Sequence, residues 1–144
     1  MHSITRGVDA KHRDFADRCA EAVRVAEQGQ AALARIFAEA AAEGMQRVAE
    51  LASPSSREAE LPFRSLAAEM AAAANMSDRT VQRRMNDAAV LEESFPATFA
   101  AWDEGRIGGG HVAVLMEHGT PLTAPEARAA FEAEALIRAE GTTP

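Results

Sequence analysis

Apolar residues recur every three or four positions through the first third of this 144-residue chain. The resulting stripe comprises Phe15, Cys19, Ala22, Val23, Ala26, Leu33, Ile36, Phe37, Met45, Val48 and Leu51. This spacing places its members on one face of an α-helix. Gly29 and Gly44 interrupt the stripe, and each glycine costs about 1 kcal/mol relative to alanine in a helix interior. The pattern therefore predicts either one long kinked helix over roughly residues 9–52 or two helices that meet near Gly29.

The rest of the chain also favours helices, so we expect an all-α fold. Alanine supplies much of the hydrophobic content, Tyr is absent, and no long run alternates β-branched and aromatic residues as a strand would. Segment 53–62 is the clearest break, because Pro54 and Pro62 should not continue a helix and its serines favour caps and turns. We therefore expect an N-terminal helical arm (1–52), a linker (53–62) and a bundle of short helices (63–144).

Residues that start and end helices divide this bundle. Asn75 tolerates the left-handed conformation that ends a helix, and Ser77 is placed to cap the next one. Pro96 suits the first turn of a further helix, which Gly105 should end. The expected helices cover roughly 63–74, 78–93, 96–104, 110–118 and 124–140, the last starting from a capping box of Thr123 and Glu126.

Charge and cysteine content narrow the class of protein. Fourteen arginines and one lysine stand against 22 acidic residues, giving a net charge of −7. An acidic chain binds polyanions poorly overall, so any contact with nucleic acid requires a local basic patch. Cys19 is the only cysteine, which excludes a disulfide within the chain, and we expect it to be a buried small hydrophobe. No stretch of eighteen apolar residues and no apolar leader occurs, so we expect a cytoplasmic protein without a membrane span.

Residues 65–88 have the layout of a helix-turn-helix. The first helix should bury Leu66 and Met70, and the second should bury Val81, Met85, Ala88 and Ala89. Asn75, Met76 and Ser77 would form the turn, with Met76 filling the corner. The same geometry also occurs as a tight corner in helical bundles that never touch DNA.

The outward residues of the second helix are of the kinds that read DNA. Arg79, Gln82, Arg83 and Asn86 should face outward, together with Asp78. Arginine pairs in a bidentate manner with guanine, and Gln or Asn pairs similarly with adenine, from a helix in the major groove. Arg64 and Arg84 could contact phosphates, and residues 64–87 carry a local charge of +1. Under the alternative reading, these arginines form ordinary surface ion pairs.

Three motifs together resemble a known family. They are the helix pair at 66–88 with its serine cap and arginine-rich second helix, the Phe95-Pro-Ala-Thr98 element, and the Gly105-Arg-Ile107 exit. This combination resembles the 13E12 repeat family, an actinobacterial domain of unknown function that typically lies N-terminal to an HNH endonuclease domain. The resemblance covers about half of the chain, from Leu66 to Ile107 and loosely to Met116. It departs from the family at Gly108–Gly110, where a small polar cap is usual.

The resemblance lends no catalytic residue to this chain. An HNH site needs a ββα unit with metal-binding histidines, and neither the strands nor a His-Asn-His run occurs here. His111 and His118 lie seven apart without a third ligand, and the Gly108–Gly110 run lacks the strand and lysine of a phosphate-binding loop. Glu132, Glu134 and Glu140 suit a solvated helix face. We expect no enzyme activity, cofactor or metal.

Two functions fit these observations. The first is a DNA-binding accessory domain that reads double-stranded DNA through Arg79, Gln82, Arg83 and Asn86. The alternative is a helical interaction or dimerisation module without affinity for nucleic acid. A 44-residue helical arm would be about 65 Å long, more than a compact domain of this size spans, and would need a partner such as a second copy. A truncated gene product without activity is a third reading.

Overall fold

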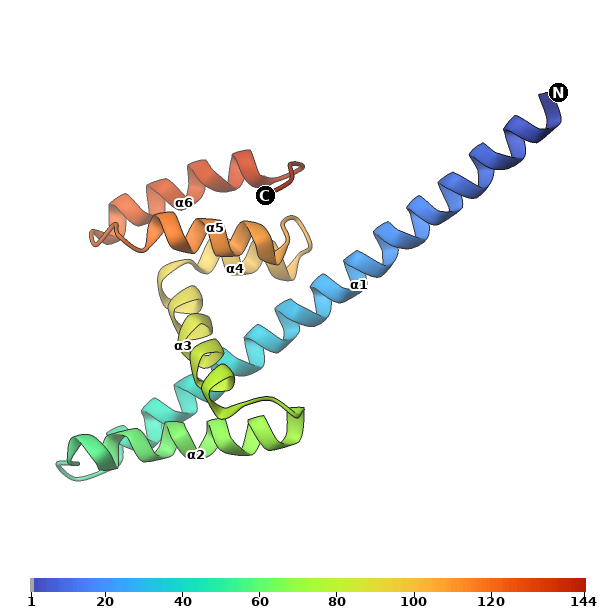
Figure 1. Ribbon diagram of the computed structural model, residues 1–144. Helices are drawn as coiled ribbons and strands as arrows, with labels where there is room; N and C mark the ends of the chain where they lie inside the picture. Colours follow the sequence, from blue (N-terminus) through green and yellow to red (C-terminus); the bar gives the residue numbers. More distant parts are fainter. Residues whose placement is uncertain (1) are drawn as a thin grey trace.

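The computed structural model describes residues 2–144, with side chains from Asp9 onward, and it contains six helices and no strand in that range (Figure 1). The helices are α1 (His2–Ala49), α2 (Ser56–Ala74), α3 (Asp78–Ser94), α4 (Pro96–Asp103), α5 (Gly109–Gly119) and α6 (Pro125–Ala139). The all-α prediction is therefore confirmed. No helix within the described residues is long and apolar enough to cross a membrane.

The first helix is continuous, so a single long helix replaces the alternative of two helices meeting at Gly29. A Cβ added at Gly29 would meet no other atom, so packing does not require a glycine there. Gly44 is buried against α2, and a Cβ there would lie 3.4 Å from the Cα of Phe63. The second glycine therefore lets α2 approach the backbone of α1 closely.

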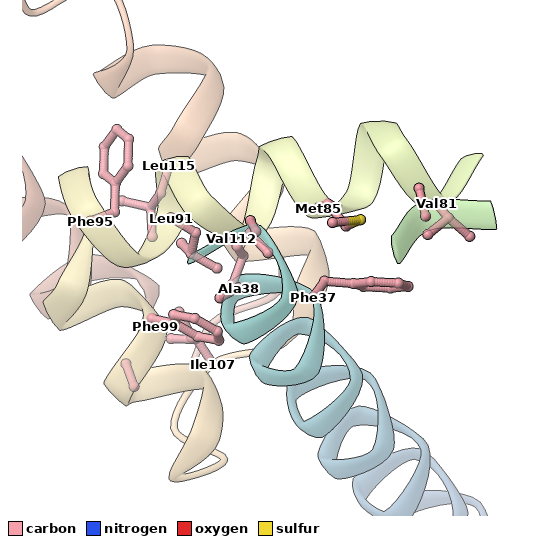
Figure 2. Packing of buried hydrophobic residues seen from close by; sticks show 14 of the residues in the cluster. Phe37, Ala38, Val81, Met85, Leu91, Phe95, Phe99, Ile107, Val112 and Leu115 are labelled. Carbon is pink, nitrogen blue, oxygen red and sulfur yellow. The ribbon is translucent and has the colours of Figure 1, made fainter. Parts of the chain in front are cut away.

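Only the second half of α1 belongs to the hydrophobic core. Ala31, Phe37, Ala38 and Ala41 are its buried apolar residues, and α1 packs most extensively against α3. Figure 2 shows Phe37 and Ala38 among apolar side chains of the later helices. The rest of that cluster is Ala67, Ala71, Val81, Met85, Ala88, Leu91, Phe95, Phe99, Ala101, Ile107, Val112, Leu115 and Leu136. One core thus spans both sides of the segment 53–62.

The corner between α2 and α3 follows the local signals in the sequence. Asn75 adopts the left-handed conformation (φ 53°) and ends α2, and the Ser77 side chain accepts a hydrogen bond from the Thr80 amide at the start of α3. Met76 between them packs against the core. Two helices joined by a three-residue turn therefore occupy the segment predicted to have this layout.

The start of α2 corrects the predicted break at Pro62. The helix begins at Ser56 and continues through Pro62, because a capping box at Ser55 and Glu58 fixes its first turn upstream of the proline. Hydrogen bonds from the Ser55 hydroxyl and amide hold the pKa of the Glu58 carboxyl below its ordinary value. The connection to α1 is consequently shorter than the ten residues expected.

A second correction concerns Thr123 and Glu132. The predicted capping box at Thr123 does not form, since α6 begins at Pro125 with Ala124 at its N-cap and no side-chain cap. Glu132 is buried rather than solvated, with 4% of its surface exposed. Its Oε1 accepts a 2.6 Å hydrogen bond from the Thr98 amide in the first turn of α4. A carboxylate from a distant helix therefore caps a helix that has no cap of its own.

Glu27 makes an equivalent contact at the start of α5. Its Oε2 accepts hydrogen bonds from the Trp102 Nε1 (3.0 Å) and from the Gly109 amide (2.9 Å). The glycines let this carboxylate approach, because a Cβ at Gly108 or Gly109 would lie 3.4 or 3.5 Å from the Glu27 side chain. The Gly108–Gly110 run, which has no polar cap residue, is therefore where a carboxylate of α1 bonds to the start of α5.

Of the predicted N-terminal arm, only residues 9–26 of α1 extend away from the other helices (Figure 1), and all of them are exposed. We restrict the name arm to these residues. Cys19 is therefore exposed, which corrects the prediction that it is buried. Its neighbours at helical spacing are apolar, but no other part of the described chain covers them. Phe15, for example, is 62% exposed.

Removing the Glu27 carboxylate should destabilise the fold. Glu27→Ala leaves the Trp102 Nε1 and the Gly109 amide without their acceptor, which we expect to lower the free energy of unfolding by about 1–2 kcal/mol. Urea denaturation followed by the fluorescence of Trp102, the only tryptophan, measures this. Glu39→Ala, at an exposed position of the same helix, is the control. Equal losses in the two variants would contradict the capping role.

Adding a methyl group at Gly119 should overpack the core. A Cβ there would lie 2.8 Å from the Cζ of buried Phe95 and 3.1 Å from Phe131, so Gly119→Ala should cost about 1–3 kcal/mol. Gly29→Ala meets nothing and should instead stabilise the helix by up to about 1 kcal/mol. Thermal unfolding of the two variants gives the comparison. A tolerated Gly119→Ala would show that α5 does not sit this close to Phe95.

Candidate nucleic-acid interface

Helix α3 divides cleanly into a buried and an exposed face. Val81, Met85, Ala88 and Leu91 are buried, with Val81 and Met85 fully so. Their packing against α1 and α2 fixes the rotation of α3 about its own axis.

The predicted reading residues lie on the opposite face of α3. Arg79, Arg83 and Asn86 are exposed, and Gln82 is half-buried at the edge of the face. At about 100° per residue, these four positions fall within roughly a quarter of the helix circumference. The structure thus brings them together into one surface, which we call the α3 face.

Arg64 and Arg84 fall on different sides of this helix. Arg64 comes from α2 and lines a groove of about 600 Å³ together with Gln82 and Asn86. Arg84 lines a separate pocket of about 380 Å³ with Asp87 and Trp102. Arg64 is therefore next to the α3 face, whereas Arg84 points toward α1 and α5 and is not part of it.

The groove has an apolar wall that the sequence did not reveal. Met45 and Val48 from the end of α1 and Phe63 from α2 line it, together with Gly44, Ala59 and Glu60. Met45 and Val48 belong to the apolar stripe of the N-terminal helix, and Met45 is 65% exposed. The close approach of α1 and α2 at Gly44 creates this wall, and the distance between two helices is not encoded in the spacing within either one.

The arginines around the α3 face lack carboxylate partners. Among residues 9–144, none of Arg64, Arg79, Arg83 and Arg84 has an acidic group within 4.0 Å. Most arginines elsewhere do have one, namely Arg18, Arg24, Arg35, Arg47, Arg106 and Arg138. The ordinary surface pairs considered as the alternative are therefore not formed by these four side chains.

Two of these arginines also work against the helix that carries them. Arg79 and Arg83 are four residues apart on the exposed face, so their charges lie one turn from each other. Like charges at this spacing destabilise a helix by about 0.2–0.5 kcal/mol. Neither side chain contributes to the core. An anion bound between the two would neutralise their repulsion.

The other candidate sites have structural explanations. His111 and His118 line one pocket of about 320 Å³ with Arg138, but no group of three or more potential metal ligands occurs among the described residues. The His111 Nδ1 accepts a hydrogen bond from the Gly108 amide. The amide of Gly109, which a phosphate-binding loop would offer to a ligand, is already bound by Glu27.

Comparison with known proteins places the chain in a family. No curated protein and no solved structure matches it. A family model described as Domain of unknown function (DUF222) matches residues 17–143. The match includes most of α1, none of which lies within the motifs between Leu66 and Ile107. Since the model covers most of the sequence, the chain belongs to the DUF222 family.

Proposed function

We propose that this chain is a non-catalytic domain that binds double-stranded DNA through the α3 face. The observation that carries the proposal is the set of arginines without acidic partners at Arg64, Arg79 and Arg83, in a chain of net charge −7. In an acidic protein, neighbouring arginines without acidic partners provide the local basic patch that binding of a polyanion would require.

Each residue of the face has a distinct role in this proposal. Arg79 and Arg83 are exposed near the start of α3, where a helix in the major groove brings side chains to base edges or phosphates. Asn86 and Gln82 would pair with adenine bases, and Arg64 on α2 would contact the phosphate backbone of the DNA beside its major groove. Arg84 is left out, because it lies in the pocket toward α1 and α5.

The affinity should be modest and should depend strongly on salt. Each phosphate neutralised by arginine contributes about −0.9 to the slope of log K against log salt. Two or three such contacts give a slope of about −2 to −3. Nonspecific binding of this kind falls at dissociation constants of about 10⁻⁴–10⁻⁶ M.

The family resemblance supports an accessory role. In the 13E12 repeat family this segment accompanies an HNH endonuclease domain, so a DNA-holding function is consistent with that context. We assign no cleavage step to any residue of this chain. The exposed arm favours a second function, association with another protein chain, which is compatible with DNA binding.

Removing the side chains of Arg79 and Arg83 should weaken DNA binding. We expect the double variant Arg79→Ala, Arg83→Ala to bind a labelled random duplex about tenfold more weakly than the unmodified chain. The reason is that two charge-assisted contacts are lost. Fluorescence anisotropy at two salt concentrations measures the dissociation constants. The control is Arg18→Ala, Arg138→Ala, which removes the same charge from arginines that are paired on α1 and α6.

The control separates a specific surface from bulk charge. If both double variants lose affinity equally, net charge rather than the α3 face governs binding. A flat anisotropy trace for the unmodified chain at low salt would contradict duplex binding altogether. In that case association with protein becomes the working account of the domain.

A further inference from the structure

The groove beside the α3 face, which we call the Arg64 groove, combines apolar and polar walls. It lies between the end of α1, α2 and α3 and has a volume of about 600 Å³. Met45, Val48 and Phe63 form the apolar wall. The polar residues that line it are Glu60, Arg64, Gln82 and Asn86. Phosphates gain nothing from an apolar wall, so the groove suits a ligand that has an apolar surface as well as a polar edge.

The two amide side chains of α3 are free to bind such a polar edge. Gln82 is half-buried beside the groove, and Asn86 lines it from one turn further along the helix. Among residues 9–144, neither amide side chain makes a hydrogen bond. Each offers both a donor and an acceptor. Because it is half-buried, Gln82 is less available than exposed Arg79 and Arg83 to a base that stays inside a duplex.

The charged residues of the groove indicate which ligand fits. Arg64 is exposed and has no acidic group within 4.0 Å among residues 9–144, so it can bind a phosphate. Glu60 is the only acidic residue that lines the groove. Its ionised carboxylate accepts hydrogen bonds but donates none. This favours a base with an exocyclic amino group, which adenine and cytosine have.

We propose that the Arg64 groove receives one unpaired adenine or cytosine of the bound DNA, an inference that rests on the proposed binding of DNA by the α3 face. The base packs against Met45 and Phe63, its edge bonds to Gln82 or Asn86, and its phosphate lies near Arg64. The groove's volume of about 600 Å³ falls within the range of about 300–1,000 Å³ typical of small-molecule sites. A single nucleotide therefore fits.

The charges around the groove favour a nucleotide over a protein segment. An apolar protein segment would cover the apolar wall but leave Arg64, Arg79 and Arg83 without anions. A second copy packed through the same surface would set arginine against arginine. A nucleotide supplies both an anion and a flat apolar surface, and stacking of bases on aromatic side chains is a general mode of binding to unpaired DNA.

Binding of DNA probes with and without an unpaired base tests the proposal. A base that is already unpaired costs least to remove from the stack. We therefore expect a labelled duplex with one bulged adenine to bind about tenfold more tightly than the same duplex without the bulge. A third probe with an abasic bulge has the same flexible backbone but no base, and it should bind like the intact duplex. Fluorescence anisotropy of the full chain measures the three dissociation constants.

Filling the groove should abolish this preference without weakening binding to the intact duplex. Ala59→Trp places a large side chain in the groove. Ala72→Trp is the matched control, because Ala72 is exposed about 140° further around α2, and it should keep the preference. Met45→Ser is a second variant, at a position that is 65% exposed, and it should reduce the preference without affecting the fold. Circular dichroism checks that each variant keeps its helices.

The outcomes distinguish this inference from the proposed function. Equal binding of the intact duplex and the bulged adenine would overturn the base site and leave duplex binding intact, with the groove then assigned to a protein partner. An abasic bulge that binds as tightly as the bulged adenine would show that flexibility is recognised, which also overturns the site. A preference that survives in both Ala59→Trp and Met45→Ser would place the base elsewhere. Failure of all three probes to bind would contradict the proposed function itself.

Discussion

The packing of α3 against the second half of α1 determines what this domain can present to a partner. Helix α1 packs most extensively against α3, and Phe37, Ala38 and Ala41 of α1 belong to the same apolar cluster as Val81 and Met85 of α3, which are completely buried. This contact fixes the rotation of α3, and with it the outward position of Arg79 and Arg83. The same contact uses only one half of α1, which leaves the arm outside the core. The outward α3 face and the exposed arm are thus both consequences of this helix pair.

Carboxylates from distant helices complete the C-terminal half. The N-cap residues of α4 and α5 are Phe95 and Gly108, which offer no side-chain acceptor, and Glu132 and Glu27 accept from the Thr98 and Gly109 amides in these first turns. These contacts give partners to amides that have none within their own helices, and they link α6 to α4 and α1 to α5. Glu27 is also the point at which the arm leaves the bundle. The acidic composition of the chain therefore has a structural component, and the unpaired arginines near α3 stand out against it.

Local chemistry made much of the fold predictable. The ends of helices at Asn75, Ser77 and Pro96 follow from residues that act on their own neighbours, and the outward face of α3 follows from helical periodicity. The errors involve contacts between distant residues. Glu132 looked like a solvated acid because Thr98 is 34 residues away, and Cys19 looked buried because its periodicity does not say whether a partner covers it. The groove beside Arg64 arises from the spacing between α1 and α2, for which the sequence of one helix has no signal.

Mapping of amide chemical shifts by NMR during titration with a random duplex tests the central claim most directly, because it locates the contact without altering the protein. The account predicts that the largest changes fall on residues 79–86 of α3, with smaller ones near Arg64 on α2, and that they diminish as salt is raised. Changes concentrated on α5 and α6, or no change at concentrations where nonspecific binding occurs, would contradict the assignment of the α3 face as a DNA-binding surface.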